Sequence, residues 1–461
     1  MIRFRKNGIS AIAALVVVMA WANAAGAATN LVVFVRDQPT DFPDPVIEEF
    51  ERRNPDLKIE LVRASASQMD DKFLVMTATQ VPVDVVISMS LVGWASYGAK
   101  GLFRDLTPYI ERDGEKLRAK GVPDFVLGAL RTVGGITSIP YSIYASYIMV
   151  YNATYFDEAG LAAPAADWDD RSWTWAAMVE AAKKLVRYNS EGQMTRAGLL
   201  IGADDISTQS LSLMWRGDLF APSTYEDGIV RELTFLTPEN IRAFSEAAAL
   251  STEHRVTQYV QPQLPGIQIS LPRGTAAMEF QAGGSIGHNW AGDYRWGMAP
   301  APLTPVLERR VPLPVWVRAA AIHSGSQHPD AAWRLIKFLL TDAYELGEFQ
   351  VAGEPAAWNV SRGITPTAWQ RFVEIMGRSL NFANPPDQLV GFLVRGVGEY
   401  ARIAASNLLV GGGDTIHYPN GPLYRWTLAA YRGEVPVEQA LAEAEREANA
   451  LLERILQELM E

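Results

Sequence analysis

Hydrophobic residues near the start of the chain form short runs separated by one helical stretch. Three strand-like runs are predicted, over residues 31–35, 57–62 and 83–87. Between the first two, Val46, Ile47 and Phe50 share one face of a helix that Asn54 and Pro55 end. This strand–helix–strand order predicts a parallel α/β sheet.

Amphipathic helices are predicted in the rest of the chain, over residues 173–188, 329–340 and 437–460. Ser172 or Thr174 can cap the first of them. The apolar side of the last helix comprises Leu441, Ala444, Ala448, Leu451, Ile455 and Leu456. No internal repeat or low-complexity segment interrupts these elements. The fold class predicted from this pattern is α/β with two lobes.

The N-terminus has the three parts of a secretory signal. Arg3, Arg5 and Lys6 precede the apolar stretch 9–22, and Ala25-Gly26-Ala27 then provides an A-x-A cleavage site. The alternative is a retained anchor, but the stretch is shorter than the ~20 residues that span a bilayer. We therefore expect cleavage and export.

Charge and cysteine content narrow the function classes. Removal of 27 residues leaves 461 − 27 = 434, with a net charge of (41 − 3) − 52 = −14. Such an acidic chain is a poor ligand for nucleic acid or anionic membranes. The chain has no cysteine, which excludes thiolate catalysis, iron–sulfur clusters, cysteine zinc sites and a lipid-modified cysteine anchor. We expect a freely diffusing protein of a Gram-negative periplasm.

Nine segments, in order, resemble one known family. They are IEEFERRNPDLKIELV, VPVDVVISM, GLFRDLTPYI, GGITSIPYSIYASYIMVYNATYFDEAGL, WTWAAMVEAAKKL, LPRGTAAMEFQAGG, YRWGMAPAP, HPDAAWRLIKFLL and EQALAEAEREANALLERI. Together they resemble family 1 of the extracellular solute-binding proteins of ABC importers, the sugar-binding group that includes maltose-binding proteins. The resemblance covers essentially the whole chain after the signal peptide.

The resemblance implies a type II periplasmic binding protein fold, in which each lobe is a mainly parallel sheet flanked by helices. The ligand binds in the cleft between the lobes, and lobe closure traps it. The implied divisions are a signal peptide over 1–27, a first lobe over 28–141 with 317–345, and a second lobe over 142–316 with 346–461. The implied partners are a small solute, expected to be a carbohydrate or polyol, and the membrane subunits of an ABC permease. A monomer without a cofactor or metal is expected.

The resemblance also implies contact residues in the loops after the first and third strands. Asp37 and Gln38 match a polar pair that contacts sugar hydroxyls in maltose-binding proteins, and their carboxylate and amide suit a polyol. The alternative is an ordinary turn in a proline-rich loop. Ser88 and Ser90 match a second contact region. The carboxylate that follows it in maltose-binding proteins is replaced here by Val92 or Gly93, which argues against a maltose-like ligand.

Aromatic and basic residues at the implied lobe crossings complete the candidate contacts. Tyrosine and tryptophan can stack on a sugar face, so the candidates for stacking are Tyr141, Tyr144, Trp215 and Trp316, although core packing is the alternative for one of the two tyrosines. Trp173, Trp175 and Trp333 are expected in the core. Arg318 pairs either with an acidic group of the solute or with a carboxylate of its own lobe. Phe392 and Arg395 match positions of a helix that lines the cleft in maltose-binding proteins.

A serine hydrolase is the alternative from another class. Gly283-Gly284-Ser285-Ile286-Gly287 matches G-x-S-x-G, the turn that presents the nucleophile of α/β-hydrolases. The residues after it, IGHNWAGDYRWG, disfavour the long helix that this turn requires. In the binding-protein hypothesis Gly283 and Gly284 let the backbone approach a solute closely, and Ser285 donates a hydrogen bond to it.

Other chemistry has little support in the sequence. The chain contains no Gly-Lys dipeptide and therefore no Walker A loop, and its five histidines have no metal-binding spacing. Paired carboxylates of a glycosidase remain compatible with the 52 acidic residues, but no motif indicates them. We therefore predict a non-enzymatic binding component of an ABC importer for a sugar or polyol. The alternatives are another solute, such as a glycerol phosphate, a polyamine or a peptide, and a hydrolase that uses Ser285.

Overall fold

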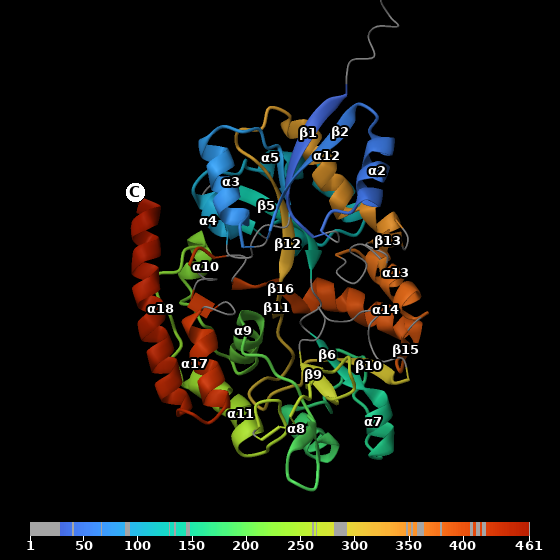
Figure 1. Ribbon diagram of the computed structural model, residues 1–461, viewed down its shortest axis with the longest axis vertical. Coiled ribbons are helices and arrows are strands. Elements are labelled where there is room, and N and C mark those ends of the chain that lie inside the picture. The colour runs from blue at the N-terminus through green and yellow to red at the C-terminus, as the bar shows by residue number, and fades with distance from the viewer. Residues whose placement is uncertain are drawn as a thin grey trace, which may run out of the picture.

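The chain folds into two lobes stacked along its long axis, each built on its own sheet (Figure 1). The computed structural model describes residues 28–460 except for 39–40, 66, 88–92, 129, 133–134, 144–147, 261, 264, 281–292, 347–348, 352–353, 357–363, 379, 406–408, 412–414 and 417–420. The predicted signal peptide, residues 1–27, therefore lies outside the described residues.

The first lobe contains a six-stranded sheet in the order β2-β1-β3-β12-β5-β4. Its strands are β1 (Thr29–Arg36), β2 (Leu57–Ala64), β3 (Val85–Ile87), β4 (Leu130–Thr132), β5 (Gly135–Ile143) and β12 (Val317–Ile322). Its helices are α2 (Asp44–Arg53), α3 (Met69–Ala78), α4 (Gly93–Ala99), α5 (Thr107–Ala119), α6 (Asp124–Leu127) and α12 (Pro329–Leu340), with the 3-10 helix η1 (Asp342–Glu345). The three strands predicted from hydrophobic runs are confirmed, and β1 pairs in parallel with both β2 and β3.

The second lobe contains a four-stranded sheet in the order β15-β10-β6-β9. Its strands are β6 (Ile148–Asn152), β9 (Met278–Phe280), β10 (Arg295–Pro300) and β15 (Asn381–Phe382). Three two-stranded sheets pair β7 (Arg187–Tyr188) with β8 (Met194–Arg196), β11 (Leu313–Val315) with β16 (Ala401–Ile403), and β13 (Phe349–Val351) with β14 (Glu354–Ala356). Its helical segments are α7 (Ala153–Glu158), α8 (Trp175–Leu185), α9 (Asp205–Met214), α10 (Thr224–Asp227), α11 (Pro238–Thr252), α13 (Pro366–Met376), α14 (Pro386–Arg395), the π-helix η3 (Gly396–Tyr400), α17 (Pro422–Tyr431) and α18 (Val437–Met460).

The two-lobed α/β architecture is confirmed, but the sheets are mixed instead of mainly parallel. In the first lobe β12 is antiparallel to both β3 and β5, and in the second β6 is antiparallel to β9 and β10. The reason is topological. The chain crosses between the lobes in opposite directions, and the strand that enters each sheet at a crossing, β6 in the second lobe and β12 in the first, runs against its neighbours.

Local sequence explains where the main helices begin and end. Thr174 caps α8 by accepting a hydrogen bond from the Ala177 amide at 3.1 Å, which resolves the choice between Ser172 and Thr174. At the end of α2, the Asn54 side chain donates to the Phe50 carbonyl at 2.8 Å. Phe50 itself is buried, so the predicted apolar face of α2 is confirmed.

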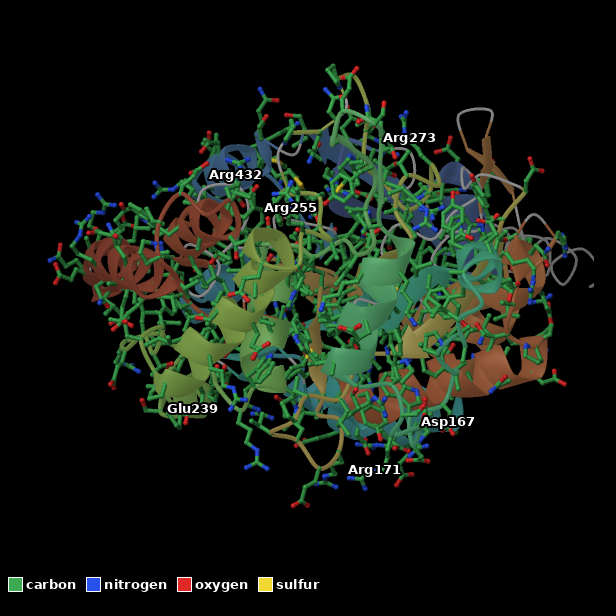
Figure 2. All side chains as sticks on the ribbon, turned by 90° about the horizontal axis from the view of Figure 1, so that it is seen from below. Asp167, Arg171, Glu239, Arg255, Arg273 and Arg432 are labelled. Carbon is green, nitrogen blue, oxygen red and sulfur yellow. The ribbon has the colours of Figure 1, made fainter. Side chains whose placement is uncertain are left out.

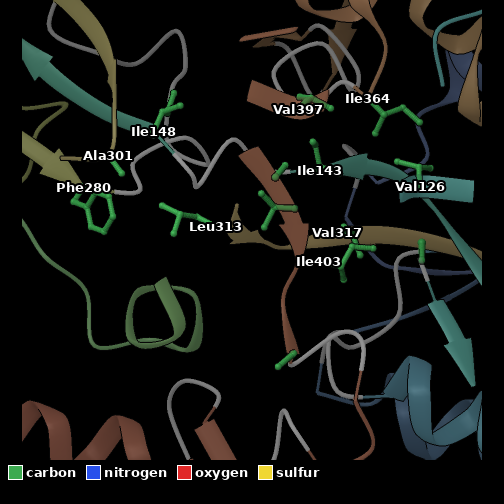
Figure 3. Packing of buried hydrophobic residues seen from close by; sticks show 14 of the residues in the cluster. Val126, Ile143, Ile148, Phe280, Ala301, Leu313, Val317, Ile364, Val397 and Ile403 are labelled. Atoms are coloured by element: carbon green, nitrogen blue, oxygen red, sulfur yellow. The ribbon is translucent and has the colours of Figure 1, made fainter. Parts of the chain in front are cut away.

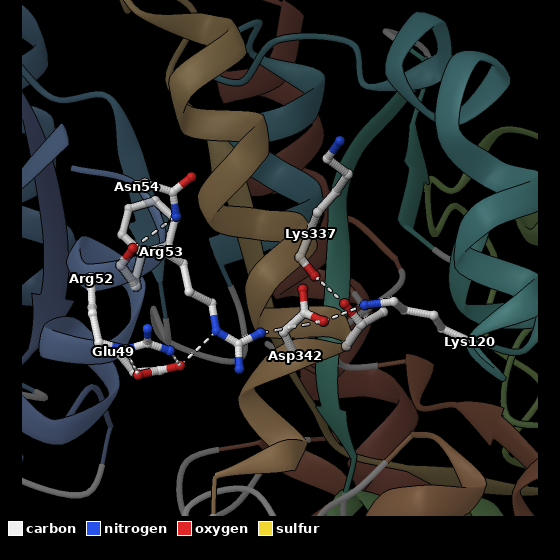
Figure 4. A network of polar contacts seen from close by, with 9 residues as sticks. Glu49, Arg52, Arg53, Asn54, Lys120, Lys337 and Asp342 are labelled. Atoms are coloured by element: carbon white, nitrogen blue, oxygen red, sulfur yellow. Dashed lines mark hydrogen bonds and ion pairs between the residues drawn. The ribbon is translucent and has the colours of Figure 1, made fainter. Parts of the chain in front are cut away.

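Ion pairs tie the outer surface of the first lobe together (Figure 4). Glu49 accepts hydrogen bonds from Arg52 and Arg53, which lower its pKa to about 2. Arg53 also lies 3.8 Å from Asp342, which in turn accepts a hydrogen bond from Lys120. The network thus links α2, η1 and the end of α5. Because most of these side chains are partly exposed, each pair contributes little to stability.

Two of the connections between the lobes join strands. β5 leads into β6, and β11 leads through Trp316 into β12. Leu313, Val317 and Ile403 are buried at the second crossing, where one hydrophobic core continues from lobe to lobe (Figure 3). β5 extends to Ile143, so the expected first-lobe boundary at residue 141 falls inside a strand. The lobe boundaries otherwise stay a prediction.

The last helix, α18, extends from the second lobe alongside the first (Figure 1). It packs on α11 and α17, with Leu441, Ala444, Ala448 and Leu452 buried. Leu452 takes the buried position that the sequence pattern gave to Leu451, which is only partly buried. Near its end, Ile455 and Leu456 pack against a small cluster that includes Ala95 of α4 in the first lobe.

Charged residues cover the outside of the second lobe. Figure 2 shows Asp167, Arg171 and Glu239 at its periphery, and all three are exposed. Trp173, Trp175 and Trp333, predicted as core residues, are each at most 5 % exposed. Within the described part of the chain, no helix combines the length and the apolar character needed to span a bilayer.

Candidate functional site

A cavity of about 200 Å³ lies in the second lobe beside the second crossing. Its apolar lining comprises Leu200, Ile201, Ile206, Ile269, Phe280 and Trp316, and its other lining residues are Gly202, Asp204, Ser207, Gln258 and Glu279. Ligand pockets usually measure about 300–1,000 Å³. A cavity of this size therefore suits a small ring or one end of a longer solute.

The cavity forms where parallel segments end. Residues 197–200 run parallel to the segment leading into β9, with Ala197 paired to Ala276 and Leu200 to Glu279. Both segments enter the cavity lining at their carboxyl ends, through residues 200–202 and through Glu279 and Phe280. Ligands of open α/β sheets bind outside the carboxyl ends of strands. The position of the cavity is thus the one expected of a ligand site.

The N-terminus of α9 forms a second wall. Asp204 caps this helix by accepting hydrogen bonds from the Ser207 amide and hydroxyl, each at 3.0 Å. Burial raises the pKa of Asp204, and the neighbouring charge of Asp205 raises it further. Gln258 holds the opposite loop, because its amide donates to the Ile201 carbonyl at 2.6 Å and accepts from the Ile201 amide at 3.3 Å.

Glu279 is the acidic residue of β9 that lines the cavity. Desolvation raises its pKa to about 7, and the negative charge of Asp204 contributes to the shift. Its side chain is partly exposed, and the space that it faces is the cavity. A carboxyl group in such surroundings is costly to ionise unless a bound group compensates its charge.

Trp316 and Arg318 anchor the second crossing to both lobes. The Trp316 indole nitrogen donates to the Asp205 carboxylate of the second lobe at 2.9 Å. Two residues later, the Arg318 guanidinium lies 2.5 Å from the buried Asp41 carboxylate, in the loop after β1. Asp41 also pairs with Arg36 at 2.5 Å. Of the two partners expected for Arg318, the structure places a carboxylate of its own lobe beside it.

The loop after β1 places Asp37 and Gln38 at the carboxyl edge of the first sheet. The Asp37 amide donates to the Ala64 carbonyl at 2.7 Å and thereby extends the β1–β2 ladder by one residue. The side chains of Asp37 and Gln38 are exposed. Because Asp41 of the same loop pairs with Arg318, this loop lies at the crossing that also carries Trp316. The two polar side chains are therefore available on the first-lobe side.

Four other predicted contact residues lie away from the cavity lining. Tyr141 is fully buried in the core. Trp215 is also buried, with the Trp175 ring 5.9 Å away edge to face and the Arg242 guanidinium over its ring at 4.9 Å. Phe392 stacks on Trp168 at 4.9 Å, and Arg395 forms ion pairs with Asp169 and Glu399.

The remaining predicted contacts fall outside the described residues. They are Ser88, Ser90, Tyr144, Gly283, Gly284 and Ser285. Segment 281–292, which contains the G-x-S-x-G motif, follows directly on Phe280 of the cavity lining. Contact between a solute and these residues stays a prediction.

Sequence reasoning missed Glu279, Asp204, Ser207 and Gln258. A signal for Glu279 was present, because charged residues rarely occupy buried strands without a partner, and it interrupts the apolar run AAMEF. Asp204 and Asp205 precede a helix, where acidic residues are common as N-terminal caps, so their presence alone does not indicate a ligand site. Gln258 offered no comparable signal, since its role depends on a loop 57 residues away.

A second hollow, of about 400 Å³, lies beside β15 and the turn between α13 and α14. Its lining comprises Val373, Gly377, Arg378, Leu380, Asn381, Phe382, Asn384 and Pro386. None of the crossing segments contributes to it. The smaller cavity at the crossing is therefore the candidate site.

Comparison with known proteins identifies relatives of the fold. The model of the bacterial extracellular solute-binding protein family matches residues 36–345. No curated protein has a significant sequence match to the chain.

Solved structures match over nearly the whole chain. An ABC substrate-binding protein from Listeria monocytogenes in complex with cycloalternan is 18% identical, has a TM-score of 0.66, and is matched over 92% of this chain and 99% of its own. A cyclic α-maltosyl-1,6-maltose binding protein from Arthrobacter globiformis is 18% identical, with a TM-score of 0.65 and coverage of 93% and 100%. An ABC transporter solute-binding protein from Agrobacterium radiobacter in complex with ribitol is also 18% identical, with a TM-score of 0.62 and coverage of 92% and 99%.

Proposed function

Since the chain belongs to the bacterial extracellular solute-binding proteins, we propose that it captures a sugar or polyol for import by an ABC transporter. The observation that carries the proposal is the cavity beside Trp316, at the carboxyl ends of parallel segments and next to a lobe crossing. The family assignment confirms the prediction of a binding protein. It also argues against the hydrolase alternative at Ser285.

The cavity lining supports a carbohydrate or polyol. An indole ring offers a face on which a sugar ring stacks, as other aromatic side chains do in binding sites. Across the cavity, Ser207, Gln258 and two carboxyl groups supply hydrogen-bond donors and acceptors. Two of the similar structures are complexes with cycloalternan and ribitol, and the third is a cyclic α-maltosyl-1,6-maltose binding protein, so they support the same class of solute.

Lobe closure is the proposed capture mechanism. Trp316 bonds to the second lobe and Arg318 to the first, so rotation about this crossing changes the gap between the cavity and the loop that carries Asp37 and Gln38. A solute bound to both sides favours the closed arrangement by as much as its affinity for the two arrangements differs. In this mechanism Asp37 and Gln38 contact the solute from the first lobe.

The proposed setting is a periplasm, reached through cleavage of residues 1–27. The acidic composition and the absence of a cysteine that could carry a lipid support a protein that diffuses freely between solute and membrane, and we expect it to be a monomer. Its partners are the membrane subunits of an ABC permease, which receive the solute from the closed form.

Replacement of the Trp316 ring tests the site. Thermal-shift and calorimetric titrations with mono- and oligosaccharides and polyols should identify a solute, and Trp316→Leu should weaken its binding by about tenfold or more. Trp316→Phe keeps an aromatic face and should lose less. Trp426→Leu is the matched control, because Trp426 is a partly buried tryptophan on α17 that bonds to Glu447 and does not line the cavity. Binding of no carbohydrate or polyol would refute the proposed solute class. An equal loss in Trp316→Leu and Trp426→Leu would refute the site.

A further inference from the structure

Two acidic residues, Asp204 and Glu279, line the cavity. Glu279 of β9 lines the cavity, and among the described residues it has no hydrogen-bond or ion-pair partner for its side chain. The one charge that shifts its pKa is that of Asp204, which is also negative. The described residues therefore supply no positive charge that compensates this carboxylate.

The groups around Glu279 add negative charge and do not neutralise it. Asp204 caps α9, and Asp205 next to it accepts a hydrogen bond from Trp316. A helix N-terminus attracts an anion, but Asp204 already occupies this one. Burial raises the pKa of the nearby Tyr259 hydroxyl, and the charge of Asp204 raises it further, so this group stays protonated. Among the described residues, the charges that chiefly shift the pKa values of Glu279 and Asp204 are those of acidic neighbours.

Most of the remaining lining is apolar or aromatic, and its neutral polar side chains are those of Ser207 and Gln258. Ile206, Ile269, Phe280 and the Trp316 ring surround the space that Glu279 faces. Apolar walls solvate a carboxylate poorly, so a positive group that enters the cavity favours its ionised form. An aromatic ring, in contrast, attracts a cation placed over its face. The same space thus offers two separate features that stabilise positive charge.

We propose that the solute carries a protonated amine, as in an amino sugar or an aminated polyol, and that its ammonium group binds the Glu279 carboxylate in this cavity. The inference rests on the proposed function and specifies the class of carbohydrate. An ammonium group supplies the counter-charge that the described lining residues do not provide, and it donates up to three hydrogen bonds. A neutral hydroxyl at the same place removes water from the carboxylate without neutralising it.

Matched neutral and amino solutes test the proposal on the mature protein. The probes are glucosamine, glucose and N-acetylglucosamine, the three corresponding galactose compounds, and 1-amino-1-deoxysorbitol with sorbitol, titrated calorimetrically. Each amine is compared with the neutral compounds of the same carbon skeleton. At about pH 7.5, where a skeleton binds at all, its amine should bind at least about tenfold more tightly than its neutral compounds. Its affinity should fall toward about pH 5.5, because protonation of Glu279 removes the charge that holds it.

The variant Glu279→Gln should remove most of this preference, reducing amine affinity by about tenfold or more and shrinking its pH dependence. Glu308→Gln, at an exposed glutamate of the same lobe, is the control and should keep the preference. Neutral partners that bind as tightly as the amines, or an amine affinity unchanged by Glu279→Gln, would overturn the inference and leave the proposed function intact.

Two further outcomes separate the inference from the function on which it rests. If no probe of either kind binds, the carbohydrate assignment fails and the amine inference fails with it. Spermidine is therefore included as a cation without a sugar. If spermidine alone binds and Glu279→Gln weakens it, the carbohydrate assignment fails while the ammonium site at Glu279 stands.

Discussion

Replacement of Glu279 by glutamine should stabilise the ligand-free protein at alkaline pH. The pKa of Glu279 is raised from its usual value of 4.5 to about 7, chiefly by desolvation and further by the charge of Asp204. Between about pH 4.5 and pH 7, Glu279 therefore keeps its proton in the folded chain and has lost it in the unfolded chain. Because the folded state then binds more protons, stability must fall as the pH rises through this interval.

The size of the effect follows from the same shift. A tenfold change in an acid constant corresponds to about 1.4 kcal/mol, so ionisation of Glu279 costs the folded chain up to about 3 kcal/mol. For a chain of this size, each kcal/mol of unfolding free energy shifts the melting temperature by about 2–4 °C, so this penalty lowers it by roughly 6–12 °C. Glutamine carries no charge at any pH, so the variant escapes this penalty above about pH 8 and gains nothing near pH 4.5.

The assay is thermal unfolding of the mature protein, first stripped of solute by reversible denaturation, from about pH 4.5 to 8.5. The difference between Glu279→Gln and wild type should grow with pH and level off above about pH 8. Glu308→Gln, at an exposed position of the same lobe, controls for the loss of one glutamate. If the Glu279→Gln and wild-type curves run parallel over the whole range, ionisation of Glu279 carries no penalty and the reasoning about the cavity is wrong.

Two predictions concern the first lobe. Asp113 accepts hydrogen bonds from Trp333 at 2.8 Å and Lys337 at 2.9 Å, and these outweigh its burial and lower its pKa from 3.8 to about 2. Its contribution of about 2 kcal/mol to the free energy of unfolding should be present above about pH 4 and lost toward pH 2. In urea unfolding, the stability of Asp113→Asn should therefore depend less on acid pH than that of wild type or of the exposed control Asp124→Asn. Equal acid dependence of the three proteins would contradict this. Asp41→Asn should cost about 3–5 kcal/mol in urea unfolding, because it removes the charge that pairs with both Arg318 and Arg36, whereas Arg318→Met should cost less since Asp41 keeps Arg36. The reverse order would show that Arg318 is held by contacts other than Asp41.

Elements with a strong local period could be predicted from the sequence. The first three strands, the helix that carries Phe50 and the long terminal helix all follow from hydrophobic spacing. The direction in which β12 enters the first sheet could not be predicted, because it depends on two lobe crossings far apart in the chain. Similarly, the choice between Leu451 and Leu452 on α18 depends on how its neighbours approach.

The candidate site was predictable only in part, for the same reason. Trp215 and Trp316 are the same residue type near similar apolar segments, yet Trp215 is enclosed by Trp175 and Arg242 while Trp316 faces the cavity. Arg318 was expected at the crossing, and the buried Asp41 that it pairs with becomes visible only in three dimensions. Glu279 lay inside a strand-like run whose glycine-rich continuation, 281–287, was the focus of the sequence reasoning.

The placement of β12 has a consequence for the order in which the chain can fold. β12 lies between β3 and β5 in the first sheet, but it begins at Val317, about 170 residues after β5 ends at Ile143. At synthesis rates of about 5–20 residues per second, roughly 10–30 s pass before this central strand exists. During that time β3 and β5 have no partner on their facing edges, so the first lobe cannot close its core as it is made. For a chain that begins with the features of an export signal, this delay lengthens the period in which the polypeptide can still be threaded unfolded through a membrane.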